Sequence, residues 1–389
     1  MPIERFFLPP ANRTAVELAP PNRRPLEFHR RMPGYVATPL VALDGLATSL
    51  GARRIWGKNE TSRLGLPSFK VLGASWAIYS VAIERLGREP EWQTISQLRE
   101  AFATLDPITL VTATDGNHGR AVAHIAKSFG FRAEVLVPQG MAKARIDALR
   151  AEGAHVIQVD GSYDDAVDES AAHAEKEGGR VLLSDTSWEG NTKVCDLIVR
   201  GYSTMFFEIE DAISEVDSEP IDIVFVQMGV GSLAAAAVAH YGAFHPRTKV
   251  IGVEPDSAAC LFESAKAGKI VKVPGPHLSV MAGLNCGLAS FATWPMLQAG
   301  LSAYLTLDDA SAVRAVRALS KSGLAVGETG ASGIAAAMEL LGDEARTLEK
   351  ESLGIGEHSN VLVLLTEGPT DPASYGEALS RPTVGPKSG

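Results

Sequence analysis

Strands and helices alternate through most of this 389-residue chain, and that alternation constrains its fold more than any other feature. Between residues 108 and 185, short runs rich in Val, Ile and Leu are each followed by a turn and then by apolar residues at helical spacing. The same order returns after residue 190, where the runs 221–229 and 360–368 are nearly continuously apolar. Such strands are buried on both faces, and intervening helices make them parallel. The sequence therefore predicts an α/β protein with open, mostly parallel, twisted sheets and helices on both faces.

The alternation is interrupted near residues 186–192, and this break indicates a domain junction. A chain of this length is typical of two or three domains. We predict a large domain made of residues 1–85 and 190–389, and a small, mobile α/β domain made of residues 86–189. A ligand is expected in the cleft between them, because clefts between domains are common binding sites.

Composition and charge exclude several classes of function. Hydrophobic residues make up 46% and charged residues 21%, as in a globular protein. With 36 basic and 46 acidic residues the net charge is −10, so no nucleic-acid partner is expected. The chain has no apolar run long enough for a signal peptide or a membrane span, which predicts a cytoplasmic protein without a membrane partner. None of the three cysteines lies in a CxxC pair, so we expect no metal site and ordinary buried thiols at Cys195, Cys260 and Cys286, with a redox-sensitive pair of Cys260 and Cys286 as the alternative.

Lys70 is the first candidate for chemistry. It follows Ser68 and Phe69 and precedes mostly apolar or small residues that are typical of a helix start. A lysine is seldom fully buried unless it is paired or used. It could be a surface residue with only its stem covered. It could instead be a nucleophile whose amine forms a Schiff base with an aldehyde.

A second group of polar residues, 112–119, lies between a predicted strand and a predicted helix. Ligands bind at the carboxyl ends of strands in open α/β sheets, and helix N-termini attract anions. Thr114 or Asp115 could instead only cap the helix, and Asn117 could only supply a turn. Asp185, at the end of the run 180–185, is likewise either a capping residue or a buried base.

The segment 228–234, MGVGSLA, is a glycine-rich turn between a buried strand and an Ala-rich helix. Such a turn lets the backbone approach a phosphate. The same residues match GxGxxA, and Glu254 ends the next strand, so a nicotinamide dehydrogenase is one alternative. It would leave Lys70 and the loop around Asn117 unexplained.

Taken together and in this order, these motifs resemble the fold type II pyridoxal-phosphate enzymes. The family has an early Lys, an (S/T)xxGNH loop, a glycine-rich phosphate loop and a hydroxyl residue on the last strand. Within it the chain resembles the diaminopropionate ammonia-lyases, because TDGNHGR carries an Asp where threonine dehydratases carry a small residue. The resemblance covers roughly residues 35–370 and includes SDTSWEG, SVMAGLNCG, GETGASG and LLTEG. The segments NETSRLG and LPS before Lys70 depart from the family's usual pattern.

The resemblance implies a pyridoxal 5'-phosphate cofactor and a role for each matching residue. The catalytic residues would be Lys70, which holds the cofactor as a Schiff base, and the acid/base groups Asp115 and Asp185. The substrate would contact Thr114, Asp115, Gly116, His118 and Asp185. The cofactor would be bound by Lys70, Asn117, Gly229, Val230, Gly231, Ser232, Leu233 and Thr366.

The implied reaction is α,β-elimination of D- and L-2,3-diaminopropionate to pyruvate and ammonia through aminoacrylate, by a homodimer acting on a small amino acid. Burial would raise the pKa of the acting aspartate above about 3.9. A threonine, serine or hydroxyaspartate dehydratase of the same fold is the main alternative. A non-catalytic amino-acid-binding protein is another, because fold alone does not determine function.

Overall fold

The computed structural model describes residues 4–10, 19–114, 116–176, 178–216 and 219–380. Its larger sheet has seven strands in the order β1-β10-β9-β8-β11-β3-β2. The two edge strands, β1 and β2, pair antiparallel with their neighbours, and the five strands between them are parallel. The strands of this sheet are β1 (Phe6–Phe7), β2 (Leu40–Ala42), β3 (Arg54–Asn59), β8 (Ile223–Gln227), β9 (Lys249–Pro255), β10 (Ala303–Leu307) and β11 (Asn360–Leu365).

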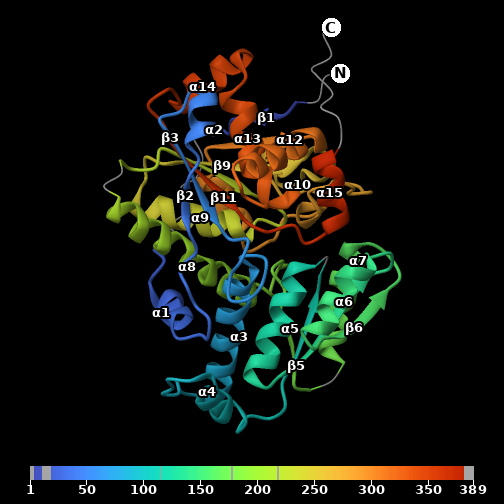
Figure 1. Ribbon diagram of the computed structural model, residues 1–389. Coiled ribbons are helices and arrows are strands. Elements are labelled where there is room, and N and C mark those ends of the chain that lie inside the picture. Colours follow the sequence, from blue (N-terminus) through green and yellow to red (C-terminus); the bar gives the residue numbers. More distant parts are fainter. Residues whose placement is uncertain (1–3, 11–18, 115, 177, 217–218, 381–389) are drawn as a thin grey trace.

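A second, four-stranded sheet is parallel throughout, in the order β6-β5-β4-β7. It lies with its helices beside the larger sheet, at the lower right of Figure 1. The predicted fold, with mostly parallel sheets, is confirmed. The strands of this sheet are β4 (Thr109–Ala113), β5 (Arg132–Pro138), β6 (His155–Val159) and β7 (Arg180–Leu182).

Helices cover both faces of the larger sheet. On β11, Leu362 and Leu364 pack into one hydrophobic core while Val361, Val363 and Leu365 pack into another. This alternation follows from the strand period of two, and explains why the run is apolar at every position. The first core includes α3 (Lys70–Leu86), α8 (Lys193–Glu215) and α9 (Ser232–Phe244), and the second includes α12 (Asp309–Lys321) and α13 (Glu328–Leu341).

The remaining helices are shorter or belong to the smaller sheet. A capping box at Ser162 begins α7. Within the described residues, no helix is both long and apolar enough to cross a membrane. These helices are α1 (Arg24–Arg30), α2 (Asp44–Ser49), α4 (Ile95–Phe102), α5 (Asn117–Phe129), α6 (Lys143–Ala151), α7 (Tyr163–Glu175), α10 (Cys260–Ala267), α11 (Trp294–Gly300), α14 (Thr347–Leu353) and α15 (Pro372–Ser380).

Two glycines bring α3 and α8 into close contact. A Cβ on Gly73 would lie 2.6 Å from Cε1 of Tyr202, and a Cβ on Gly201 would lie 2.5 Å from the carbonyl oxygen of Leu72. Any side chain at Gly201 would push the two helices apart, because the obstacle is backbone. The contact matters for the site because α3 begins at Lys70 and α8 follows the segment that carries Asp185.

Candidate functional site

A cavity lies between the two sheets, and most of the predicted site residues line it. Lys70 reaches it from the first residue of α3, and Phe69 beside it donates its backbone N–H to the carbonyl oxygen of Thr366 at 3.3 Å. The lysine side chain is 24% exposed, so it is neither a surface residue nor fully buried. Lys70 is therefore held where its amine faces the cavity.

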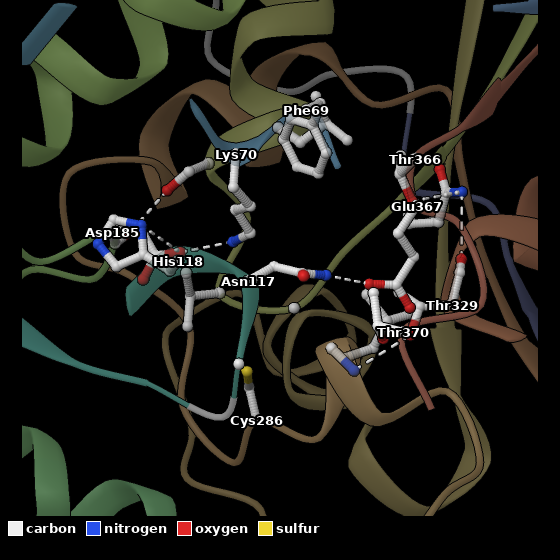
Figure 2. A pocket seen from close by; sticks show the side chains of 18 of the residues that line it. Phe69, Lys70, Asn117, His118, Asp185, Cys286, Thr329, Thr366, Glu367 and Thr370 are labelled. Atoms are coloured by element: carbon white, nitrogen blue, oxygen red, sulfur yellow. Dashed lines mark hydrogen bonds and ion pairs between the residues drawn. The ribbon is translucent and has the colours of Figure 1, made fainter. Parts of the chain in front are cut away.

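Lys70 and Asp185 form the closest charged pair in the cavity (Figure 2). Lys70 Nζ donates to Asp185 Oδ2 at 2.6 Å, and the Asp185 side chain is 7% exposed. His118 Nδ1 lies 3.9 Å from the same carboxylate oxygen. His118 Nε2 lies 2.9 Å from the carbonyl oxygen of Leu183, which can only accept, so Nε2 is the donor in this bond. This bond aims Nδ1 at Asp185.

The pKa of Asp185 differs from the value that burial alone predicts. Burial opposes ionisation, but the Lys70 ammonium and then His118 hold the pKa of Asp185 well below its usual range. The expectation of a raised pKa is therefore wrong for Asp185, because a neighbouring cation outweighs desolvation. This carboxylate is ionised at neutral pH and can accept a proton.

The loop before α5 contains predicted site residues of two kinds: some line the cavity, and one supports the loop. Gly116, Asn117 and His118 line the cavity. The Thr114 side chain is buried below the loop, where its hydroxyl accepts the N–H groups of Gly116 at 2.9 Å and Gly119 at 3.0 Å. The structure thus gives Thr114 the capping role that was the alternative to substrate binding. Asp115 lies outside the described residues.

The glycine-rich turn forms one wall of the cavity. Gly231 has φ +106°, and a Cβ there would lie 2.6 Å from Leu297 Cδ1, so only glycine fits without strain. A Cβ on Gly229 would lie 3.2 Å from the carbonyl oxygen of Gly283. The N-terminal N–H groups of a helix have no partner within it, and here they begin α9 at the cavity wall. This arrangement favours an anion such as a phosphate.

Ser232 connects this turn to the aspartate. Its hydroxyl donates to the carbonyl oxygen of Asp185 at 2.6 Å, and Cys195 Sγ lies 3.4 Å from the same oxygen. The hydroxyl of Ser232 is therefore already bonded within the protein. Its backbone N–H is the first of α9. Ser232 thus connects the glycine-rich turn to the backbone of Asp185.

The opposite wall is built by the last strand and its loop. Gln227 Nε2 donates to the carbonyl oxygen of Leu364 at 2.7 Å and lies 3.4 Å from Thr366 Oγ1. Asn117 Nδ2 donates to Glu367 Oε2, as Figure 2 shows. Thr366 and Asn117, both predicted to contact the cofactor, thus line the same cavity, with Asn117 bonded to the neighbour of Thr366.

Several cavity residues are missing from the sequence prediction. Gln227 had a signal, because it is the polar residue that ends an otherwise apolar strand. Arg145 and Tyr163 begin the segments that follow β5 and β6, and ligands concentrate at such carboxyl ends. The polar and charged lining residues that were missed are Arg120, Arg145, Tyr163, Gln227, Cys286, Thr329, Glu367 and Thr370.

Glu254 serves the fold and not a dinucleotide. It is fully buried, and its two oxygens accept the N–H groups of Leu261 at 2.8 Å and Phe262 at 2.7 Å, at the start of α10. Burial raises its pKa to about 8. The carboxylate is therefore not available to a ribose hydroxyl. All three cysteines are buried free thiols, as predicted.

Comparisons with known proteins agree with this geometry. The model of the family described as "Pyridoxal-phosphate dependent enzyme" matches residues 32–367. Diaminopropionate ammonia-lyase of Escherichia coli K12 is 34% identical over 360 residues, which cover 91% of this chain and 89% of the relative. A serine racemase of Oryza sativa subsp. indica is 27% identical and covers 91% of this chain and 92% of the relative.

Solved structures show the same relationship. The crystal structure of the Escherichia coli diaminopropionate ammonia-lyase with D-serine superposes with a TM-score of 0.88, at 32% identity, and covers 97% of each chain. Its complex with an aminoacrylate–PLP azomethine reaction intermediate gives 0.81 at 33% identity, over 92% of this chain and 90% of that one. The resemblance inferred from the motifs is thus confirmed over nearly the whole chain, and this protein belongs to the pyridoxal-phosphate dependent enzymes.

Proposed function

We propose that this enzyme is an ammonia-lyase that converts 2,3-diaminopropionate to pyruvate and ammonia. The observation that carries the proposal is the Lys70–Asp185 pair, an amine and an ionised carboxylate 2.6 Å apart in a cavity that also receives the N-terminus of α9. The similarity to diaminopropionate ammonia-lyases of known structure supports this choice of substrate.

The cavity residues fit pyridoxal phosphate. Lys70 offers a primary amine, and the turn before α9 carries no side chain at Gly229 or Gly231, so its backbone N–H groups can approach a phosphate. Asn117 and Thr366 offer polar groups to a ring placed between them. We propose that the phosphate is held by Gly229, Val230, Gly231, Ser232 and Leu233.

The protein's own groups then manage the protons. Bound pyridoxal phosphate withdraws electrons from the substrate's α-carbon and makes its proton removable. Asp185, ionised and held at its backbone carbonyl by Ser232, is positioned to accept a proton from that carbon or to exchange one with Lys70. Gly116 and His118 line the side of the cavity where the substrate carboxylate would lie, and Thr114 supports their loop.

The atoms of the reaction balance without an oxidant. Loss of the α-proton and the β-amino group releases one ammonia and leaves 2-aminoacrylate. Addition of water to this enamine gives pyruvate and a second ammonia. We propose that Asp185 serves one enantiomer of the substrate and that Asp115 serves the other.

We further propose that the unit 86–189 moves as a small domain against the rest of the chain. Closure would exclude water until the enamine leaves. We propose a cytoplasmic homodimer, for which the exposed side chains of Leu278, Leu288 and Phe291 supply apolar surface. Sedimentation of the purified enzyme tests the dimer directly, and a monomer would contradict it.

The test of the function is an absorbance scan of the purified holoenzyme before and after D- or L-2,3-diaminopropionate, followed by a pyruvate assay. We expect a visible cofactor band that each enantiomer perturbs, with pyruvate from both. Lys70→Ala should abolish the band and the product, while the exposed Lys143→Ala should keep both. A band with pyruvate from serine or 2-oxobutyrate from threonine, and no pyruvate from diaminopropionate, would move the assignment to a dehydratase.

A further inference from the structure

Three side chains converge at the end of α9 that is opposite the phosphate turn. Glu210 lies on α8, His240 lies in the last turns of α9, and His245 directly follows that helix. Nε2 of His240 lies 3.0 Å, and Nε2 of His245 3.2 Å, from the same Oε1 of Glu210. Each residue offers a ligating atom, and these atoms all lie within 4.8 Å of one another. The two helices run side by side in Figure 1.

His240 is the unusual member of the cluster. Its side chain is 1% exposed and is surrounded by the rings of Phe206, Phe207 and Phe244. Among the residues that the structure describes, neither of its ring nitrogens has a hydrogen-bond partner. Glu210 Oε1 lies within hydrogen-bonding distance of His240 Nε2. Since no hydrogen bond forms, this oxygen lies away from the direction of the ring N–H. Buried polar groups are nearly always satisfied, and an exception calls for a bound ion or water.

The donor set and spacing suit a divalent transition metal. Zn²⁺ binds imidazole nitrogen at about 2.0–2.1 Å and carboxylate oxygen at about 2.0–2.2 Å in tetrahedral geometry, which places neighbouring ligand atoms roughly 3.3 Å apart. The separations of 3.0 and 3.2 Å are close to that value. Imidazole and carboxylate together favour Zn²⁺ over Ca²⁺ or Mg²⁺, which prefer oxygen alone.

We propose that Glu210, His240 and His245 form a binding site for Zn²⁺ or a divalent ion of similar ligand preference. His245 is 41% exposed and gives the ion a path from solvent, so the fourth position would hold water. The site uses no cysteine, which is why cysteine spacing in the sequence does not indicate it.

The surroundings support a cation in spite of a nearby arginine. Arg23 Nη2 lies 3.6 Å from the other carboxylate oxygen of Glu210. Its charge is balanced by Asp211, which accepts from it twice, at 2.8 and 3.0 Å. Arg23 thus orients the carboxylate without facing Oε1, as outer partners of metal ligands do. The C-terminal end of a helix also favours positive charge.

A metal there would join α8 to α9. It would hold the helix that carries the phosphate turn at its far end, without touching the cavity. Because the ligands are assembled only in the folded chain, binding would raise the unfolding midpoint by a few degrees at saturating Zn²⁺. Catalysis with cofactor bound would change little.

The experiment is a Zn²⁺ titration of chelator-treated holoenzyme, followed by calorimetry and by metal analysis after gel filtration. We expect one Zn²⁺ per chain in the wild type, and at least tenfold weaker binding in His245→Asn and Glu210→Gln. The matched control is His124→Asn, which removes another histidine paired with a glutamate, 2.9 Å from Glu152, but with no second histidine beside it. It should bind as the wild type does.

The outcomes are distinct. If the wild type binds no Zn²⁺, or if His245→Asn binds as much as the wild type, the site does not exist as proposed. If His124→Asn weakens Zn²⁺ binding as much as the other two substitutions do, the ion binds elsewhere, and the proposal is also overturned. His245 is half-exposed, so its substitution should leave the fold and the cofactor band intact, which a scan of each variant verifies.

Discussion

This molecule has two sets of ion pairs with nearly the same distances between their charged atoms. One set faces the cavity, and the other is sealed inside the protein. In the cavity, Lys70 and Asp185 meet at 2.6 Å with side chains 24% and 7% exposed. Below the strand that precedes Lys70, a sealed cluster made of Lys58, Glu60, Arg63 and Glu208 has contacts of 2.6–2.7 Å, and no member is more than 2% exposed.

The difference lies in what else each charge touches. Arg63 donates to Glu60, to Glu208 and to the Thr38 hydroxyl, and Lys58 donates to Glu208 and to the Thr38 carbonyl oxygen. The cluster is saturated with protein partners and fixes the chain that leads to Lys70. The Lys70–Asp185 pair faces a cavity instead. A short distance between charges therefore does not identify a reactive pair, whereas access to a ligand does.

The largest expected effect is on stability, when the sealed cluster is broken. Glu208→Gln leaves Lys58 and Arg63 buried with less compensating charge, which typically costs about 3–5 kcal/mol. The measurement is urea unfolding. Glu84→Gln, which breaks the exposed pair with Lys193, is the control and should cost less than about 1 kcal/mol. Equal losses would show that burial does not distinguish the two pairs.

The next effect is on the rate, when the cavity pair is broken. Asp185→Asn removes an acid/base group and should lower kcat by about 10²–10⁴-fold, with the larger loss on one substrate enantiomer. The cofactor band should persist, because Lys70 remains. The exposed Asp147→Asn serves as control. An unchanged kcat with both enantiomers would reduce Asp185 to a structural partner of Lys70.

A third change acts on the helix contact that both ion-pair sets share. Gly201→Ala places a Cβ 2.5 Å from the Leu72 carbonyl oxygen and should destabilise the fold by roughly 1–3 kcal/mol. Gly242→Ala, within α9 but with open space around it, should instead be neutral or stabilising by up to about 1 kcal/mol. If both variants behave alike, close approach of α3 and α8 is not required.

The smallest expected effect is a change of stability with pH. It comes from a histidine beside the sealed cluster. His29 is fully buried, and burial followed by the Arg63 charge lowers its pKa to about 3. The unfolded histidine, with a pKa of about 6.5, binds more protons, so stability falls as pH falls. From about pH 7 to about pH 5 the expected loss is roughly 2 kcal/mol.

Urea unfolding at the two pH values measures this loss, and His29→Gln should show less of it. Asp185 stays ionised throughout this range because Lys70 keeps its pKa low. Glu254, whose pKa is raised to about 8, contributes more stability as the pH falls over this range, so the test is the difference between wild type and variant. A His29→Gln variant that loses as much stability as the wild type would contradict the assignment to His29.

The sequence was enough to predict the parallel sheets, because buried strands and amphipathic helices carry local patterns. It did not indicate β10, whose five residues come directly after the short helix α11, nor β3, which lies between β11 and the edge strand β2 of the larger sheet. Those strands are defined by pairing with distant segments, and a short local pattern does not contain that information.

The same limit applies to the site. Motifs identified Lys70, Asn117 and the glycine turn, because each has a local requirement. The lowered pKa of Asp185 depends on Lys70, which is 115 residues away along the chain. The supporting role of Thr114 and the presence of Arg145 in the cavity likewise depend on how the loops fold.

Ser232 links two parts of the site, since its backbone begins α9 directly after the glycine-rich turn proposed to hold the phosphate, and its hydroxyl holds the Asp185 backbone. In thermodynamic terms, occupancy of the turn and placement of the carboxylate are coupled equilibria. Coupling is reciprocal, so a ligand that restrains Asp185 must tighten retention of the phosphate by the same factor. Substrate analogues that engage this carboxylate should therefore slow the loss of cofactor during dialysis, even where they undergo no reaction.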